Sequence, residues 1–540
     1  MSTRIERYLF IFWAIIGLAV MMHIAIFDFR IISAPISTQV QYTPDDAYYY
    51  LGLAKNYATL HLWTFDSGVT TTTGFHPLLA LLLCVIYIIF QPTRDSFVLF
   101  GLALSAFVTL TGTLIAWRIG FRDKKTYFFL MFLGLVFSTR IYAINSTSIM
   151  EWPLVILIAM AYSINLYQGY DRASIFNHIC MFFWGMLGSL ARLDFGLLPF
   201  SFFIVSLIMS RFVKKKYPLQ LSSIGLVGAA IGVLIVLGHN YLITGNFLQS
   251  SARIKVYWAL TQGIMTNFVQ ALFLILESLG SWFQNFELGT VFLALVVTTV
   301  IYIFIKKDLN KFKSFSCLVS AFENHRSFRG YTFFLSAILC IIGYIGFYTY
   351  NASIQPWYTA NLIIPVFITL MSVTAYLDKR LNAKNQLIFR TISSTVIFIA
   401  IIYNIASVQQ INSSNSPWPH QPLMVEAGEY LKDHNYDGRI GSWNAGIIGY
   451  YQGGDIINID GLVNDEVYDY ILDGQLSTYL SKTGIRYIID FETMITQKDL
   501  RVRGGYDDAA FLQGLHPLKV FDDGKNDRYW KRMTLFEFMP

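Results

Sequence analysis

The feature that most limits the fold is a series of long apolar segments that recur along most of the chain. A helix needs about 20 apolar residues to cross a bilayer. Apolar windows lie near 8–27, 77–90, 96–117, 127–145, 151–167, 174–191, 195–210, 220–239, 264–283, 288–305, 331–349, 358–376 and 386–408. Charged residues make up only 14% of the chain, against about 25% in soluble domains. The sequence therefore predicts a polytopic α-helical membrane protein.

Clusters of Lys and Arg indicate which ends of these helices face the cytoplasm. Cytoplasmic loops carry an excess of basic residues, and such clusters occur at 4–7, 118–125, 211–216, 306–313 and 379–384. With these loops inside, the helices alternate without conflict if 264–283 and the short 77–90 segment lie in the membrane interface. This predicts about 11 spanning helices plus interfacial ones. It also predicts a multi-pass protein of the inner (plasma) membrane, with a cytoplasmic N-terminus and a periplasmic or extracellular C-terminal domain. The formal charge of +6 belongs to these loops, so no nucleic acid is expected as a partner.

The composition changes after residue 409, where a polar linker leads into a mixed segment. Residues 412–421 are rich in Asn, Ser and Pro, which is typical of a linker. Beyond it, strands are expected at 438–443, 455–460, 486–490, 518–521 and 532–538, and helices at 423–434, 444–451 and 464–480. We predict a transmembrane domain over 1–409, with a first exoplasmic loop at 28–76, and a small exoplasmic α/β domain over 410–540. The four cysteines lack metal-ligand spacing, so no metal site is expected from them.

Two adjacent carboxylates, Asp45 and Asp46, follow the first apolar segment. Either acid could cap the helical pattern at 47–60, but the cap does not need two. A general base needs a carboxylate beside the reacting hydroxyl. A second acid can hold the acceptor, bind a metal or raise the pKa of its neighbour. We therefore expect Asp45 and Asp46 to be catalytic.

Most other ionisable residues outside the basic clusters fall on the same predicted exoplasmic face, which favours one site at the outer edge of the membrane. Arg192 and Asp194 could simply form a local ion pair, and Glu151 could simply favour the positive end of a helix. Arg253 and Lys255 could meet lipid headgroups or neutralise a lipid phosphate. The candidates for donor or acceptor binding are His76, Glu151, Arg192, Asp194, Asn240, Arg253, Lys255, Trp357 and Tyr358.

Five motifs in order along the chain carry a resemblance to a known superfamily. They are Asp45-Asp46-Ala-Tyr-Tyr, Thr73-Gly-Phe-His76-Pro77-Leu, Ser148-Ile-Met-Glu151, Leu190-Ala-Arg192-Leu-Asp194, and Gly446-Ile-Ile-Gly-Tyr-Tyr with Asn458-Ile-Asp460-Gly-Leu-Val-Asn464. Together they resemble the GT-C superfamily of polytopic glycosyltransferases, and most closely its bacterial branch of arabinofuranosyl- and mannosyltransferases.

The resemblance implies an inverting transfer of a sugar at the outer membrane face. The donor would be a polyprenyl-phosphate-linked sugar in the membrane lipid, and the acceptor a hydroxyl of a glycan, glycolipid or protein. Asp45 would act as the base and Asp46 would position the acceptor or an ion, while Arg253 and Lys255 would neutralise the lipid phosphate. No cofactor is required for a monophosphate leaving group, although the acid pair leaves room for a divalent cation.

The sequence leaves other functions open. A membrane transporter of a lipid or glycan, without transferase activity, would place ionisable residues at mid-membrane and often contain inverted halves; neither feature is evident. A protein-directed transferase or a polysaccharide ligase would use the same acid site. A non-catalytic receptor would instead bind through its soluble C-terminal domain.

Overall fold

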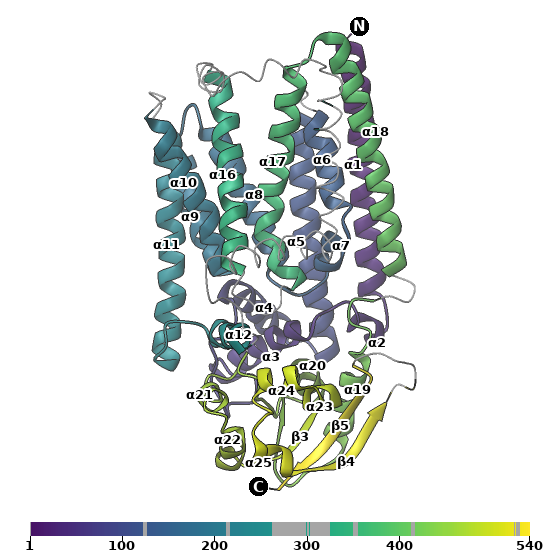
Figure 1. Ribbon diagram of the computed structural model, residues 1–540, viewed down its shortest axis with the longest axis vertical. Coiled ribbons are helices and arrows are strands. Elements are labelled where there is room, and N and C mark those ends of the chain that lie inside the picture. Colours follow the sequence, from purple (N-terminus) through teal and green to yellow (C-terminus); the bar gives the residue numbers. More distant parts are fainter. Residues whose placement is uncertain are drawn as a thin grey trace.

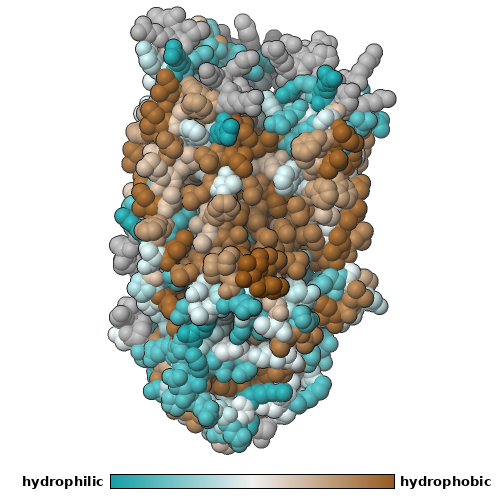
Figure 2. Space-filling model, turned by 180° about the vertical axis from the view of Figure 1, so that it is seen from behind, coloured by the Kyte–Doolittle hydropathy of each residue, from teal (hydrophilic) through white to brown (hydrophobic). Residues whose placement is uncertain are grey.

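The computed structural model describes residues 2–122, 127–211, 217–261, 299, 302, 325–348, 355–411, 416–522, 524 and 530–539. In these residues a long helical bundle stands on a small α/β domain, and the N-terminus lies at the end of the bundle away from that domain (Figure 1). A broad apolar band covers the bundle between two hydrophilic ends (Figure 2). An apolar surface of this kind can face lipid. The helices beneath it pair their own backbone N–H and C=O groups, as the lipid core requires.

The described part of the bundle contains 7 helices that are long and apolar enough to span a membrane, or 8 if the bent pair α6–α7 is one span. The long helices are α1 (Ser2–Ile32), α5 (Arg94–Arg122), η1 with α10 (Leu193–Gly196, Leu197–Ser210), α11 (Tyr217–Thr244), α16 (His325–Tyr348), η3 with α17 (Pro356–Thr359, Ala360–Lys379) and α18 (Ala383–Ile411). The other bundle helices are α6 (Tyr127–Phe137), α7 (Arg140–Ser146), α8 (Trp152–Gly169) and α9 (Ile175–Ala191). The fold is therefore a multi-pass helical membrane domain, as predicted. The expected total of about 11 spans stays a prediction, because the window at 264–283 lies outside the described residues and only residues 299 and 302 of the window at 288–305 are described.

Short helices fill the junction between the bundle and the small domain. They are α2 (Ile36–Gln39), α3 (Asp45–Leu60), α4 (Pro77–Phe90) and α12 (Ser250–Thr261), and α3, α4 and α12 lie close together there (Figure 1). Pro77 opens α4, where a missing N–H does no harm. Helix α3 packs against α4 and against the C-terminal domain, which buries all three consecutive tyrosines Tyr48, Tyr49 and Tyr50.

The C-terminal domain is a five-stranded sheet with helices packed around it. The strands are β1 (Arg439–Ser442), β2 (Ile456–Asn458), β3 (Ile485–Phe491), β4 (Leu515–Asp522) and β5 (Arg532–Phe538), in the order β2-β1-β3-β5-β4. The β1 strand is parallel to β2 and β3, whereas β5 is antiparallel to β3 and β4. The helices are α19 (Pro422–Asp433), α20 (Ala445–Gln452), α21 (Tyr468–Leu472), α22 (Leu476–Thr483), α23 (Glu492–Thr496), α24 (Lys498–Gly504) and α25 (Ala509–Gln513). The prediction of a small C-terminal α/β domain is confirmed.

Candidate functional site

A cavity lies at the junction, where α3, α12, η3, the segment before α4 and the start of α8 meet the C-terminal domain. Its atom-free volume is about 450 Å³, including the open mouth. The lining residues are Asp46, Tyr49, Tyr50, Leu53, Gly74, Phe75, His76, Met150, Glu151, Ser251, Lys255, Trp357, Tyr358, Leu462 and Val463. The cavity thus brings together predicted site residues that are hundreds of positions apart in the sequence.

The two adjacent acids of the first loop have different surroundings. The carboxylate of Asp45 accepts hydrogen bonds from the backbone N–H groups of Ile447 (2.6 Å) and Gly446 (3.3 Å) at the start of α20. It is not part of the cavity lining. Burial and the nearby charge of Asp46 raise the pKa of Asp45 to about 7, against the opposing effect of the backbone donors. Asp45 therefore connects α3 to the C-terminal domain.

Asp46 faces the cavity instead. Within the described part of the chain, its carboxylate accepts no hydrogen bond, so its oxygens are available to a bound molecule. Burial raises the pKa of Asp46, the charge of Lys255 opposes this rise, and the charge of Glu151 adds to it. A half-buried carboxylate with free oxygens is the arrangement that a general base needs.

Lys255 of α12 supplies a positive charge to the same cavity. Its ammonium donates a hydrogen bond of 2.5 Å to the hydroxyl of Tyr358 and lies 5.0 Å from the centre of that ring. Burial opposes the charged form, but the interactions with Tyr358 and Asp46 outweigh it and raise the pKa of Lys255. Lys255 is therefore a protonated cation at neutral pH, and it faces the side of the cavity that holds Asp46.

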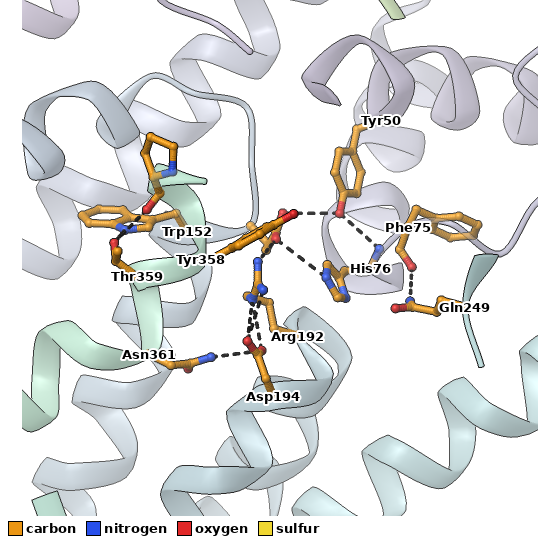
Figure 3. Close-up of polar contacts among 12 residues, drawn as sticks. Tyr50, Phe75, His76, Trp152, Arg192, Asp194, Gln249, Tyr358, Thr359 and Asn361 are labelled. Atoms are coloured by element: carbon orange, nitrogen blue, oxygen red, sulfur yellow. Dashed lines mark hydrogen bonds and ion pairs between the residues drawn. The ribbon is translucent and has the colours of Figure 1, made fainter. Parts of the chain in front are cut away.

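A buried ionic cluster lies on the bundle side of the cavity (Figure 3). Arg192 donates to Glu151 and to both carboxylate oxygens of Asp194, at 3.0 Å from Nε and 3.1 Å from Nη2. Tyr348 bonds to both Arg192 and Asp194, and Asn361 donates to Asp194 at 3.1 Å. The Arg192 guanidinium also lies beneath the Tyr358 ring, 5.1 Å from its centre. Arg192 and Asp194 do form the local ion pair, and that pair supports the cavity wall from behind.

His76 and Glu151 form the part of this wall that reaches the cavity. The hydroxyl of Tyr50 accepts a hydrogen bond from the His76 backbone N–H (3.1 Å) and donates to Glu151 (3.3 Å). Nε2 of His76 lies 3.7 Å from Glu151. Burial lowers the pKa of His76 to about 4, so the imidazole is neutral at physiological pH. Glu151 also occupies the N-cap of α8, as the sequence suggested, and thus has both a helix-end and a cavity position.

Two predicted site residues point elsewhere. Arg253 lies between two carboxylates of the C-terminal domain, 3.9 Å from Asp465 and 3.6 Å from Asp469, and 3.9 Å from the centre of the Tyr468 ring. Asn240 donates to the backbone carbonyl of Phe247 and so closes its own loop. Neither residue lines the cavity. Trp357, by contrast, does line it, next to Tyr358.

The C-terminal domain contributes residues that sequence reasoning did not select. Leu462 and Val463 line the cavity, and Asp465 accepts hydrogen bonds from the backbone and side chain of Thr73. Ser250 of α12 donates to the carbonyl of Leu462 at 2.9 Å. The motif from 458 to 464 signalled this segment, but nothing in it indicated which residues would reach the cavity.

No group of three or more His, Cys, Asp or Glu side chains is arranged to hold a metal ion in the residues that the structure describes. Of the acid pair, Asp45 already binds backbone N–H groups with both oxygens.

Comparisons with known proteins give one partial family match and several structural ones. A family described as a domain of unknown function (DUF8728) matches residues 408–536. No curated protein matches the sequence.

The structural matches cover nearly the whole chain. The Archaeoglobus fulgidus oligosaccharyltransferase in complex with zinc and sulfate has a TM-score of 0.56 and 13% identity, over 96% of this chain and 72% of the other. The same protein tethered with an acceptor peptide gives 0.51 and 14%, over 94% and 73%. ArnT from Cupriavidus metallidurans, bound to undecaprenyl phosphate, gives 0.50 and 11%, over 97% and 98%. These likenesses show the fold: the chain has the overall architecture of the oligosaccharyltransferase and ArnT structures. That architecture agrees with the fold that the resemblance to the GT-C superfamily implied.

Proposed function

We propose that the protein is an inverting glycosyltransferase that moves a sugar from a polyprenyl-phosphate donor to a hydroxyl of a cell-envelope glycan, glycolipid or protein. The observation that carries the proposal is the half-buried carboxylate of Asp46, which has no hydrogen-bond donor among the described residues and shares a cavity at one end of the bundle with the cation of Lys255. A base and a phosphate-binding cation are the two groups that such a transfer needs. The related folds support the substrate classes, since one was solved with undecaprenyl phosphate and another with an acceptor peptide.

In the proposed reaction, Asp46 takes the proton from the acceptor hydroxyl. The oxygen of that hydroxyl attacks the anomeric carbon of the donor sugar from the face opposite the phosphate. The bond between that carbon and the phosphate oxygen breaks, and the lipid monophosphate leaves with the electron pair. Lys255 stabilises the negative charge on the leaving phosphate. Most of the rate enhancement would come from positioning and from this charge stabilisation.

This proposal exchanges the roles of the two acids that the resemblance implied. There Asp45 was the base and Asp46 positioned the acceptor; the contacts favour the reverse, because Asp45 is held by backbone donors of α20 and Asp46 is not. Asp45 would then fix the start of α3, and with it the direction of Asp46. Asp45 remains the rival candidate, since its pKa of about 7 also suits a base.

The location of the charged groups favours an enzyme over a transporter. Asp46, His76, Glu151 and Lys255 surround a cavity that Leu462 and Val463 of the C-terminal domain also line, whereas a transporter would place such groups at the middle of the membrane. The basic clusters at 4–7, at the start of α1, and at 379–384, between α17 and α18, lie at the opposite end of the bundle (Figure 1), where Arg390 contacts Glu6 and Asp378. By the positive-inside rule, we propose that the cavity faces the periplasmic or extracellular side of the inner membrane. A reporter fused to the C-terminus should be active only on that side.

Substitution of each acid tests the assignment of the base. Asp46→Asn should reduce transfer from a polyprenyl-phosphate sugar by about 100-fold or more, the usual contribution of a general base, with the thermal unfolding temperature nearly unchanged. Asp45→Asn should retain more activity and lose more stability. Full loss of transfer in a stable Asp45→Asn protein, with activity kept in Asp46→Asn, would return the role of base to Asp45. Near-normal transfer in both variants would refute the proposed function.

A second pair of variants separates the two cations of the predicted phosphate site. Lys255→Ala should raise the KM for the donor, because the leaving phosphate loses its cation. Arg253→Ala should leave that KM nearly unchanged and weaken the attachment of α12 to the C-terminal domain, because Arg253 contacts Asp465 and Asp469. A higher donor KM in Arg253→Ala alone would instead place the phosphate beside Arg253.

A further inference from the structure

A second group of unpaired donors lies where α12 and α24 meet the start of α20. It consists of Arg503 of α24, Trp258 of α12 and Trp443, which follows β1. The guanidinium carbon of Arg503 is 4.7 Å from the Trp258 ring centre and 5.8 Å from that of Trp443. The two indoles are themselves in contact, with ring centres 5.3 Å apart.

All three side chains bury a nitrogen that has no acceptor. Nε of Arg503 and Nε1 of both indoles bond to nothing in the part of the chain that the structure describes. Trp258 is only 3% exposed, so water cannot easily satisfy its N–H. Buried polar groups are nearly always hydrogen-bonded, and these three are all donors. Their missing partner is an acceptor, and the charge of Arg503 favours an anionic one.

In the part of the chain that the structure describes, Arg503 has no carboxylate as a direct counterion. Arg503 forms no ion pair with any residue that the structure describes, and the acid that influences it electrostatically is Asp460. Asp460 is buried and accepts a hydrogen bond from the Leu462 N–H at 2.6 Å. Burial raises its pKa well above the usual value, which disfavours a negative charge on Asp460. Arg253 and Lys255 differ from Arg503, because Arg253 forms an ion pair with Asp465 and Lys255 donates a hydrogen bond to Tyr358.

The position of Arg503 relative to the cavity indicates which substrate carries the anion. In the proposed reaction the donor phosphate is bonded directly to the reacting carbon, so its cation must line the cavity, as Lys255 does. Arg503 does not line it. It packs instead against Trp258, which is one helical turn after Lys255 on α12. An anion at Arg503 therefore belongs to a part of the substrate that is remote from the reacting bond. The acceptor, which extends beyond its reacting hydroxyl, is such a molecule.

Resting on the proposed function, we propose that Arg503, Trp258 and Trp443 form a subsite for an acidic group, a carboxylate or a phosphate, on the acceptor glycan. The indole faces hold the guanidinium by cation–π attraction, and its free N–H groups bind the oxyanion in the planar, two-pronged way of arginine. Gly504 allows α24 to approach closely, since a Cβ there would lie 2.7 Å from the Trp443 ring. The enzyme would thus select acidic acceptors through its C-terminal domain.

Binding of small acidic sugars to the full-length protein in detergent micelles tests the proposal without any need for transfer. Glucuronic acid or glucose 6-phosphate should raise the thermal unfolding temperature of the wild type, whereas glucose should not. Arg503→Gln should weaken this binding by about tenfold or more, the effect of one charge-assisted hydrogen bond, and Arg503→Lys should have an intermediate effect. Lys498→Gln is the matched control, because it removes the same charge from an exposed position on the same helix.

Undecaprenyl phosphate is the probe that distinguishes the two sources of an anion. Its binding should be equal in the wild type and in Arg503→Gln. If Arg503→Gln loses undecaprenyl phosphate and keeps the acidic sugars, the anion is the donor phosphate and the acceptor subsite is wrong. A wild type that binds neither acidic sugar, or an Arg503→Gln protein that binds them normally, also overturns the proposal. These outcomes are independent of the Asp46→Asn assay, which tests the transfer reaction itself.

Discussion

Arg192 provides the strongest test of the ionic cluster behind the cavity. Its guanidinium contacts Glu151, Asp194 and Tyr348, and its side chain is only 5% exposed. Arg192→Met would fill a similar volume but leave the carboxylates of Glu151 and Asp194 buried without their common cation. Those two acids would repel each other and lose their strongest donors.

The expected loss of stability follows from the number of buried groups left unpaired. Removal of one partner from a buried ion pair costs about 3–5 kcal/mol. Here one cation serves two acids, although Tyr348 and Asn361 still donate to Asp194. We expect Arg192→Met to lower the free energy of unfolding by at least about 3 kcal/mol. Arg192→Lys should be intermediate, because an ammonium cannot reproduce the fork that reaches both acids.

Unfolding in mixed micelles with increasing dodecyl sulfate, followed by tryptophan fluorescence, measures this loss. The triple variant Arg192→Met, Glu151→Gln, Asp194→Asn is the control, since neutral partners tolerate the missing cation. It should be more stable than Arg192→Met alone. A single variant within about 1 kcal/mol of the wild type, the worth of an exposed pair, would refute the description of the cluster as buried and mutually dependent. So would a triple variant less stable than Arg192→Met.

Three further predictions concern the junction between the domains. Gly74→Ala should lower both stability and transfer, because a Cβ there would overlap the carbonyl oxygen of Leu462, whereas Gly238→Ala, which meets nothing within 4 Å, should do neither; equal unfolding temperatures for the two variants would contradict this. Burial raises the pKa of Asp45 from 3.8 to about 7, so its contribution to stability is complete below about pH 4 and is lost as the pH rises through 7. Asp45→Asn should therefore flatten the pH dependence of the free energy of unfolding over that range. An unchanged slope would contradict the raised pKa of Asp45. Transfer should survive treatment with EDTA, since no described group of side chains is arranged as a metal site, and loss of activity that only a divalent cation restores would refute metal-independent transfer.

The sequence predicted the fold well where one local pattern decides the outcome. The apolar windows and the basic clusters are one-dimensional signals, and they suffice for a multi-pass bundle because lipid requires long apolar helices. The alternating patterns after residue 410 likewise matched the strands β1 to β5 within a few residues. The sheet order β2-β1-β3-β5-β4 could not be predicted, because strand pairing depends on contacts between distant segments.

The sequence predicted several of the residues that line the cavity, but not the contacts that each residue makes. Topology alone gathered His76, Glu151, Lys255 and Tyr358 on one face, and the cavity contains all four. The partners of Arg253 could not be anticipated, because Asp465 and Asp469 are more than 200 positions away and approach it only when the C-terminal domain docks. Arg503 could not be selected from the sequence for the same reason. Its contacts with Trp258 and Trp443 form only in the folded chain, and in the sequence it is one of several basic residues in a short helix.

The adjacency of Asp45 and Asp46 itself explains why the sequence could not divide their roles. Both acids lie in the first turn of α3. Successive residues of a helix are about 100° apart around its axis and do not face each other, so two neighbouring carboxylates are directed at two different surroundings. One meets the backbone donors of α20, and the other meets the cavity. The two acids therefore differ in position: Asp45 holds the first turn of α3 against the C-terminal domain, and this contact directs Asp46 toward the cavity. Docking of that domain and orientation of the base are then coupled, so variants that loosen the docking should reduce transfer even when Asp46 is intact.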